Sequence, residues 1–385
     1  MPDSHRRDAL GRWLLSEAYP LWSRRAWDER QGGFYERLTA NGPVLTDPRR
    51  ARVQLRQIYS FACAPDLGWG GDVRDRVAEG LAHLRLRYVR EDGLVRAVVG
   101  PDGAVVDDRA LLYDQAFALL AFAAAHRVLG QDGGFKQAAE ALLERIQSTF
   151  KRRGPGFRSE GAIERPLSSN PNMHLLEAAL AWRSLSDDPR WSRLVEDLVE
   201  LALDQLIDAP SGILREHLDV VGTRCAGIQG RLVEPGHQFE WAWLLLRAGV
   251  RGPLCAGSAS QRQEPTATFA AARRLIVVGE SYGVRYGVAV NALLDDMSVH
   301  DPRARLWPQA ERLKAHALMA RLTGEPHHER LAAEALDSLL RYLDTGVHGL
   351  WHDQRLPDGG FVSEPSPASS FYHIVCAAQE LTASP

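Results

Sequence analysis

The segment Ala116–Ala125 has the sequence AFALLAFAAA, ten residues without a polar side chain. A helix formed by these residues has no face that suits water, so other elements must surround it. Val73–Tyr88 is of the opposite type, with apolar residues three or four positions apart and charged residues between them. Such a helix buries one side and exposes the other. Alternation of these two types predicts an inner layer of helices wrapped by an outer layer.

A short pattern, a glycine followed by an aliphatic or aromatic residue, recurs along the whole chain. Each copy is weak evidence alone, but six copies lie 56 to 75 residues apart and divide the 385 residues into six units. The copies are Gly33-Phe34, Gly93-Leu94, Gly156-Phe157, Gly212-Ile213, Gly287-Val288 and Gly349-Leu350.

Each unit is predicted to hold one helix of each type. The amphipathic, outer helices are expected near residues 5–23, 72–90, 133–151, 187–206, 265–281 and 325–344. The more apolar, inner helices are expected near residues 49–65, 109–128, 168–184, 232–248, 304–322 and 367–382. Six such pairs predict an all-α, single-domain (α/α)6 barrel over residues 1–385, with the glycine segments as short β-hairpins over one mouth. An open helical solenoid is the alternative, but no unit has the polar face of a terminal cap.

Composition excludes several classes of protein. The net charge of −3 provides no basic field for nucleic acid, and no apolar run reaches the roughly 18 residues of a membrane span. The four cysteines form no CxxC pair, so neither a disulfide framework nor a structural zinc site is expected. Residues 1–12 lack the apolar core of a signal peptide, and with these cysteines they indicate a cytoplasmic protein.

Four further regions have a structural interpretation only. Residues 208–231 and 250–264 are expected to be loops. The arginine-rich stretch Arg303–Arg312 is interpreted as a partly solvated helix, and His327-His328 as surface residues. Nucleotide-binding glycine loops and the GxSxG serine motif are absent from the sequence.

Polar residues collect in the first turns of the predicted inner helices. Burying such groups without partners costs a few kcal/mol each, so their presence needs an explanation. If the inner helices run parallel, as in an α/α barrel, their N-terminal ends meet at one mouth and form one pocket. The residues concerned are Arg56, Tyr113, Asp114, Asn170, His174, His237, Trp307 and His373.

Two of these histidines have a glutamate three positions further on. His174 precedes Glu177 and His237 precedes Glu240, and positions i and i+3 share one helical face. A carboxylate there can accept the imidazole N–H, fix the tautomer and raise the basicity of the ring. The alternatives are core histidines satisfied by nearby acids, or a metal site. The order His-x-x-Glu is neither HExxH nor the Glu-x-x-His of di-iron bundles, so no metal is expected.

Two other residues have both a structural and a functional interpretation. Trp307 is either core packing or a flat platform for a sugar ring. Arg56 is either half of a structural ion pair or a group that holds an anion or a sugar oxygen.

Four motifs resemble the N-acylglucosamine 2-epimerase superfamily, and the resemblance spans most of the chain. They are NPNMHLLEA at 170–178, EPGHQFEWAW at 234–243, RLWPQAE at 305–311 and PASSFYH at 367–373. The resemblance implies an (α/α)6 barrel, a small sugar as substrate, no metal or redox cofactor, and a possible homodimer.

The resemblance also implies roles for individual residues. His237 and His373 match the two general acid/base histidines, and Arg56 matches the arginine that holds substrate oxygens near the reacting carbons. His174 matches a third histidine that contacts the sugar, and Glu240 a carboxylate that orients the histidine one turn away. The candidate sugar-binding residues are Asn170, Tyr113, Trp307, Glu177 and Asp114.

The reaction expected is proton transfer at the carbon next to a sugar carbonyl. Removing that proton gives an enediolate, which a cation stabilises, and an imidazole can take and return the proton. The PASSFYH ending is more similar to mannose isomerases than to cellobiose 2-epimerases. We therefore expect an aldose–ketose isomerase that interconverts mannose, or its 6-phosphate, and fructose. The alternatives are a sugar 2-epimerase, a glycoside hydrolase on the same barrel, and a noncatalytic sugar-binding protein.

Overall fold

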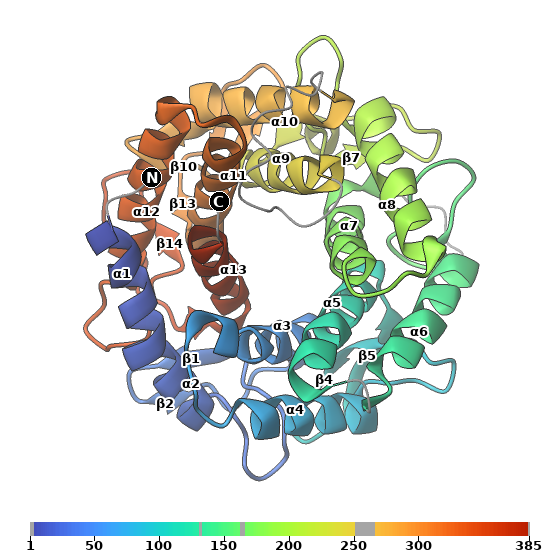
Figure 1. Ribbon diagram of the computed structural model, residues 1–385, viewed down its shortest axis with the longest axis vertical. Coiled ribbons are helices and arrows are strands. Elements are labelled where there is room, and N and C mark those ends of the chain that lie inside the picture. The colour runs from blue at the N-terminus through green and yellow to red at the C-terminus, as the bar shows by residue number, and fades with distance from the viewer. Residues whose placement is uncertain (1–3, 131–132, 162–165, 251–265, 384–385) are drawn as a thin grey trace.

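Two concentric rings of helices make up the protein (Figure 1), seen in a computed structural model that describes residues 4–130, 133–161, 166–250 and 266–383. The inner ring consists of α3 (Ala51–Ala62), α5 (Leu112–Leu129), α7 (Ser169–Arg183), α9 (Pro235–Gly249), α11 (Leu306–Thr323) and α13 (Phe371–Thr382). The outer ring consists of α1 (Ser4–Trp13) with α2 (Tyr19–Arg25), α4 (Val73–Arg87), α6 (Phe135–Phe150), α8 (Pro189–Leu201), α10 (Ala267–Val278) and α12 (Pro326–Leu343).

The inner ring is closed. Each inner helix packs on the next, and α13 packs on α3, which returns the ring to its start. The predicted (α/α)6 barrel is therefore confirmed, and its open-solenoid alternative is wrong. Short π-helical turns extend or interrupt three outer helices, namely η1 (Leu14–Ala18), η4 (Ala202–Leu206) and η6 (Gly279–Gly283). The described 3-10 turns are η2 (Pro65–Leu67), η5 (Ile228–Gly230) and η7 (Ala368–Ser370).

Short antiparallel strands join the outer helices to the inner ones. The strands are β1 (Arg37–Thr39), β2 (Gly42–Pro43), β3 (Arg49–Arg50), β4 (Arg96–Val99), β5 (Val105–Ala110), β6 (Leu167–Ser168), β7 (His217–Leu218), β8 (Leu232–Val233), β9 (Val284–Arg285), β10 (Val288–Ala289), β11 (Ala292–Leu294), β12 (Val299–Asp301), β13 (Ala304–Arg305), β14 (Gln354–Arg355) and β15 (Ser366–Pro367). β1 pairs with both β2 and β15, with Leu38 opposite Ser366, so strands from the two ends of the chain share one sheet.

The repeated glycine segments have one structural purpose. In five units, an amide side chain in the first turns of the inner helix accepts from a backbone N–H just after the glycine and donates to the C=O of the same residue. The pairs are Gln54 with Phe34, Gln115 with Val95, Asn172 with Phe157, Gln238 with Leu214 and Gln309 with Ala289. In the last unit the Ser366 hydroxyl makes the same two bonds to Trp351. These clamps fix the start of each inner helix, where the polar residues lie.

Gly349 shows why the repeat needs glycine. Its φ of 87° is in the left-handed region. A Cβ at this position would come within 2.7 Å of the Glu17 carbonyl oxygen. An alanine would therefore be strained by its backbone conformation and would also collide with η1.

Breaking one clamp should destabilise the whole barrel. Gln309→Leu leaves the N–H and the C=O of Ala289 buried without partners, and each such loss costs about 1–3 kcal/mol. We expect the free energy of unfolding to fall by about 2–4 kcal/mol. Denaturant unfolding monitored by circular dichroism measures this change. Gln137→Leu, on the exposed side of α6, is the matched control and should change stability by less than about 0.5 kcal/mol. Equal stability of the two variants would contradict the clamp.

Two surface predictions from the sequence are only half right: Arg303 and His327 are exposed, as predicted, but a charged or polar residue of each stretch is buried. Arg312 is buried, and its Nε donates to Glu280 Oε1 of η6 at 2.5 Å. His328 is also buried, with its Nδ1 2.9 Å from the Nδ1 of His316. The loop prediction for 208–231 holds apart from β7 and η5, and 251–264 lie outside the described residues.

Candidate active site

The polar residues at the inner-helix starts converge on one site. Arg56 of α3 donates from Nη2 to the Tyr113 hydroxyl at 2.6 Å. Its guanidinium carbon lies 4.4 Å from the ring centre of Phe117 and 5.2 Å from that of Tyr372. The Arg56 Nε is buried and has no hydrogen-bond partner among the described residues. Arg56 is therefore a cation held by aromatic rings, with a donor still free.

Trp307 lies close to both principal histidines, His237 and His373. Its ring centroid is 5.1 Å from that of His237 and 5.6 Å from that of His373. The indole is half-buried, whereas both histidines are buried. Two imidazoles, from α9 and α13, thus lie next to one flat apolar ring from α11, and such a ring is suited to the face of a sugar.

Each of these histidines is held by a carboxylate. His237 Nδ1 lies 2.7 Å from Glu216 Oε2, and His373 Nδ1 lies 2.7 Å from Glu311 Oε1. A carboxylate at this distance favours the tautomer with hydrogen on Nδ1. The other nitrogen, Nε2, has no hydrogen-bond partner on either ring within the described ranges. Nε2 is therefore the atom of each histidine that is available for a proton.

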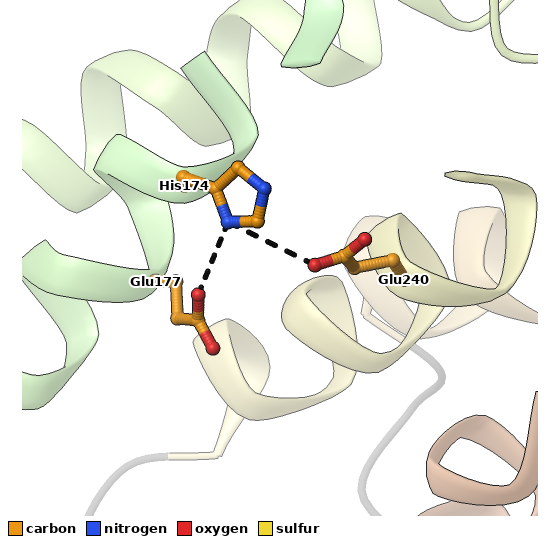
Figure 2. Close-up of side chains that lie close together, drawn as sticks. All are labelled: His174, Glu177 and Glu240. Carbon is orange, nitrogen blue, oxygen red and sulfur yellow. Dashed lines mark hydrogen bonds and ion pairs between the residues drawn. The ribbon is translucent and has the colours of Figure 1, made fainter. Parts of the chain in front are cut away.

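The predicted partner of His237 is wrong. Glu240 shares a helical face with His237, but its side chain is directed toward α7, where its Oε1 lies 3.9 Å from His174 Nδ1 (Figure 2). Glu216, from the segment before β7, takes the place beside His237. Spacing within one helix identified the face but could not identify a partner from another part of the chain.

His174 has the partner that the sequence predicts. Its Nδ1 lies 3.3 Å from Glu177 Oε2 (Figure 2). The Tyr372 hydroxyl donates to the same oxygen. Burial lowers the pKa of His174 to about 4, although Glu177 opposes this shift. Burial alone would raise the pKa of Glu177, but hydrogen bonds from His174 and Tyr372 and the charge of Lys314 lower it to about 2. At neutral pH a neutral His174 therefore donates to a carboxylate.

His237 and His373 are in opposite protonation states at neutral pH. Burial lowers the pKa of His237, but Glu216 and Glu234 more than offset this and raise it to about 10. Burial, with the charges of Arg56 and Lys314, lowers the pKa of His373 well below its ordinary value. One ring is a cation that can give a proton and the other is a neutral base. Environments that separate two pKa values in this way are typical of acid–base sites.

Asp114 and Asn170 lie at the edge of this arrangement. Asp114 is fully buried, 3.1 Å from Arg52 Nε, and burial raises its pKa to about 6 despite that arginine. Asn170 is half-buried, and its Oδ1 is buried without a hydrogen-bond partner in the described part of the chain. Asn170 therefore offers a free acceptor, while Asp114 holds Arg52.

Some important residues had weak or no signals in the sequence. Glu216 lies in a region predicted to be a loop, which has no periodicity to place it. Glu311 lies four positions after Trp307, and Lys314 lies seven positions after Trp307, so all three share one helical face. This spacing could have identified Glu311 and Lys314 as site residues.

Three groups of histidine and carboxylate atoms are close enough to share an ion by distance. They are His174 with Glu177 and Glu240, Glu216 with Glu234 and His237, and Glu240 with Glu311 and His373. We assign none of them as a metal site. In the third group the Lys314 ammonium donates to Glu311 at 2.7 Å and takes the place of a cation. In the second, the Glu216 carboxylate already contacts His237 Nδ1 at 2.7 Å.

The fold is an (α/α)6 barrel, and buried histidine–carboxylate pairs lie at the starts of its inner helices. The N-acylglucosamine 2-epimerase (GlcNAc 2-epimerase) family matches residues 33–377, and the chain belongs to this family. It is therefore an isomerase or epimerase, as the motifs predicted.

Named relatives include both kinds of enzyme. The chain is 42% identical over 380 residues to a mannose-6-phosphate isomerase of Rhizobium meliloti (strain 1021), covering 97% of this chain and 95% of the relative. It is 28% identical to a D-mannose isomerase of Thermobifida fusca, covering 71% and 68% of the two chains. The structure of a cellobiose 2-epimerase from Spirochaeta thermophila DSM 6192 superposes with a TM-score of 0.84 at 21% identity, covering 97% of this chain and 95% of that one. Within the described residues, no helix is both long and apolar enough to cross a membrane.

Proposed function

We propose that the protein is an aldose–ketose isomerase that interconverts mannose, or its 6-phosphate, and fructose. The observation that carries the proposal is a pair of buried histidines next to Trp307, one with its pKa raised and the other with its pKa lowered. Similarity to a mannose-6-phosphate isomerase and to a D-mannose isomerase supports the choice of sugar.

The proposed reaction starts at C2 of the open-chain aldose. The neutral Nε2 of His373 takes the C2 proton, and the electron pair of the broken C–H bond forms the C1–C2 double bond of an enediolate. Arg56 stabilises the negative oxygen, and the His237 imidazolium gives it a proton. His237 then takes the proton of the C2 hydroxyl, and His373, whose proton exchanges with solvent while the enediolate is bound, gives a proton to C1. The product is the ketose, and both histidines recover their starting states.

The other predicted residues are proposed to bind and orient the sugar. Trp307 would cover one face of the ring, and the free Oδ1 of Asn170 would accept from a hydroxyl. Tyr113 positions Arg56. His174 would assist ring opening, with Glu177 and Glu240 beside it, and Asp114 would act by holding Arg52.

A 2-epimerase is the alternative, because a proton returned to the opposite face of C2 gives the epimer. The test compares kcat/KM for mannose, mannose 6-phosphate, N-acetylmannosamine and cellobiose, with each product identified by chromatography. We expect fructose or fructose 6-phosphate as the main product, with the higher kcat/KM on one of the first two sugars. Preferential epimerisation of N-acetylmannosamine or cellobiose, without ketose, would contradict the proposal.

Removing the carboxylate beside His237 should move the alkaline limit of activity. His237 must be protonated to act as the acid, so activity is expected to fall as pH rises through its pKa of about 10. Glu216→Gln removes the nearest charge that raises this pKa. We expect the alkaline limb of the kcat/KM profile to move down by at least about one unit, which is tenfold in protonation. Glu200→Gln, on the outer helix α8, is the control and should leave the limb in place. An unmoved limb in Glu216→Gln would exclude His237 as the acid.

The reaction should need no metal. Dialysis against EDTA is expected to leave kcat unchanged, because Arg56 and His237 supply the positive charge at the enediolate. Metal content and activity are measured before and after dialysis. Loss of activity that a divalent ion restores would overturn the metal-free reaction.

The cellular location and the oligomeric state of the protein also stay proposals. The free thiols of Cys63, Cys225 and Cys376 suit a reducing compartment, and we propose a cytoplasmic location. A homodimer is proposed from the family resemblance alone, and light scattering after size exclusion tests it.

A further inference from the structure

Lys314 lies within the site but has no part in the proton transfers described above. It is on α11, and its side chain has no exposed surface. Its Nζ donates to Glu311 Oε2 at 2.7 Å and lies 3.8 Å from the ring centre of Trp243. The chain has only three lysines, and the other two lie at or next to the ends of α6. A buried ammonium is costly unless it is paired, so this position needs an explanation.

Glu311 connects Lys314 to His373. One carboxylate oxygen accepts from Lys314, and the other lies 2.7 Å from His373 Nδ1. The three side chains form a continuous chain of contacts from α11 to α13. An ionised Glu311 can only accept at His373 Nδ1, which leaves the Nε2 lone pair free for the sugar.

A protonated Glu311 would reverse this arrangement. Its hydroxyl could donate to His373 Nδ1, and the ring hydrogen would then sit on Nε2. An Nε2 that carries a hydrogen cannot accept the C2 proton. The ionisation of Glu311 therefore decides whether His373 can act as a base.

The surroundings of Glu311 favour protonation unless Lys314 is present. Burial raises the pKa of Glu311, the nearby Glu177 carboxylate raises it further, and Lys314 lowers it. Glu240 is also buried, and burial with the charge of Glu311 raises its pKa well above the ordinary value. Lys314 is the cation in direct contact with this group of three carboxylates.

We propose that Lys314 is a positioning residue: its buried ammonium keeps Glu311 ionised, and Glu311 in turn keeps His373 in the tautomer whose Nε2 is free to take a proton. The groups that face Lys314 are Glu311 of α11, Glu240 of α9, Glu177 of α7 and Cys376 of α13. Those that face His373 are Glu311, Lys314, Arg56 of α3, His174 and Glu177 of α7, and Glu240 of α9. The proposal rests on the base function proposed for His373.

The first test is the pH dependence of Lys314→Met, which keeps the length of the side chain and removes its charge. We expect kcat at pH 7 to fall at least tenfold. We also expect activity to recover as pH rises, because Glu311 then loses its proton, so the acidic limb of the kcat profile should move up by at least about one unit. Lys314→Arg, which keeps the charge, should keep the acidic limb of the native protein. Lys151→Met, which breaks the ion pair with Asp197 far from α11 in sequence, is the control for loss of a paired lysine.

The second test reads the tautomer directly and needs no turnover. Nitrogen NMR of the ¹⁵N-histidine-labelled protein distinguishes a protonated Nε2 from a free one, and His373→Asn assigns the signal. We expect hydrogen on Nδ1 of His373 at pH 7 in the native protein, and on Nε2 in Lys314→Met. A folded Lys314→Met with the native acidic limb would overturn the proposal. If that variant does not fold, an Nε2–H tautomer of His373 in the native protein would overturn it. Absence of turnover on every sugar, with the expected tautomers, would instead count against the proposed function.

Discussion

Replacing His373 with asparagine is expected to lower kcat at least about 10²-fold, the usual contribution of a general base. The amide side chain cannot take the C2 proton, although its size and its contact with Glu311 can be kept. His237→Asn should cause a loss of similar size, because the enediolate oxygen then has no acid within reach. Progress curves of ketose formation measure both losses.

His327→Asn is the matched control for these histidine variants. His327 lies exposed on the outer helix α12 and contacts Arg330. Its replacement should leave kcat within about twofold. Near-native kcat in His373→Asn, with circular dichroism unchanged, would remove His373 from the reaction.

The second large effect is expected at Arg56. Arg56→Met keeps much of the packing against Phe117 and Tyr372 but removes the charge that stabilises the enediolate. Loss of a group that stabilises a developing negative oxygen costs about 10²–10³ in kcat. We expect a loss of this size in kcat, with a smaller change in KM.

Arg274→Met, on the exposed side of α10, is the control for loss of an arginine. Both variants remove one positive charge, so the ratio of their kcat values measures the effect of removing it from the site and not from the surface. If Arg56→Met changed only KM, Arg56 would bind the ground state of the sugar. Another donor would then have to stabilise the enediolate oxygen.

The sequence predicts this fold well because its signals are repeated. Ala116–Ala125 is apolar on all sides and lies inside α5. Val73–Tyr88 is amphipathic and consists of α4 and the residue that follows it. Both patterns are local in sequence, and each shows directly which faces of its helix are buried. The glycine repeat was visible too, but its cause was not: the clamp of Gln54 on Phe34 joins residues 20 positions apart that no periodicity relates.

The sequence predicted which histidines form the candidate site, but it did not predict most of their carboxylate partners. The first turns of the inner helices contain His174, His237 and His373, and the barrel brings them together as expected. Partners from other segments were not predictable. Glu216 reaches His237 from an irregular segment, and the contact of Glu311 with His373 depends on how α11 packs on α13.

Burial also changed the interpretation of the two acid/base histidines. In the sequence both lie in the first turn of an inner helix, and the one difference noted is that His237 has a glutamate, Glu240, three positions further on. In the structure His237 has two carboxylates nearby, whereas His373 has Arg56 and Lys314 close to it. This difference in charge, which only the three-dimensional arrangement supplies, is the reason why we propose His237 as the acid and His373 as the base.

The proposed reaction transfers a proton between a histidine and the carbon next to the carbonyl, and an NMR time course with mannose in D2O follows this transfer. If mannose itself is not turned over, the same experiment is done with mannose 6-phosphate. We expect the ketose to appear first and to carry deuterium at C1. Glucose, or its 6-phosphate, appearing first with deuterium at C2 would contradict the isomerase and establish a 2-epimerase. A ketose that forms with its original hydrogen and no deuterium would contradict histidine-mediated proton exchange.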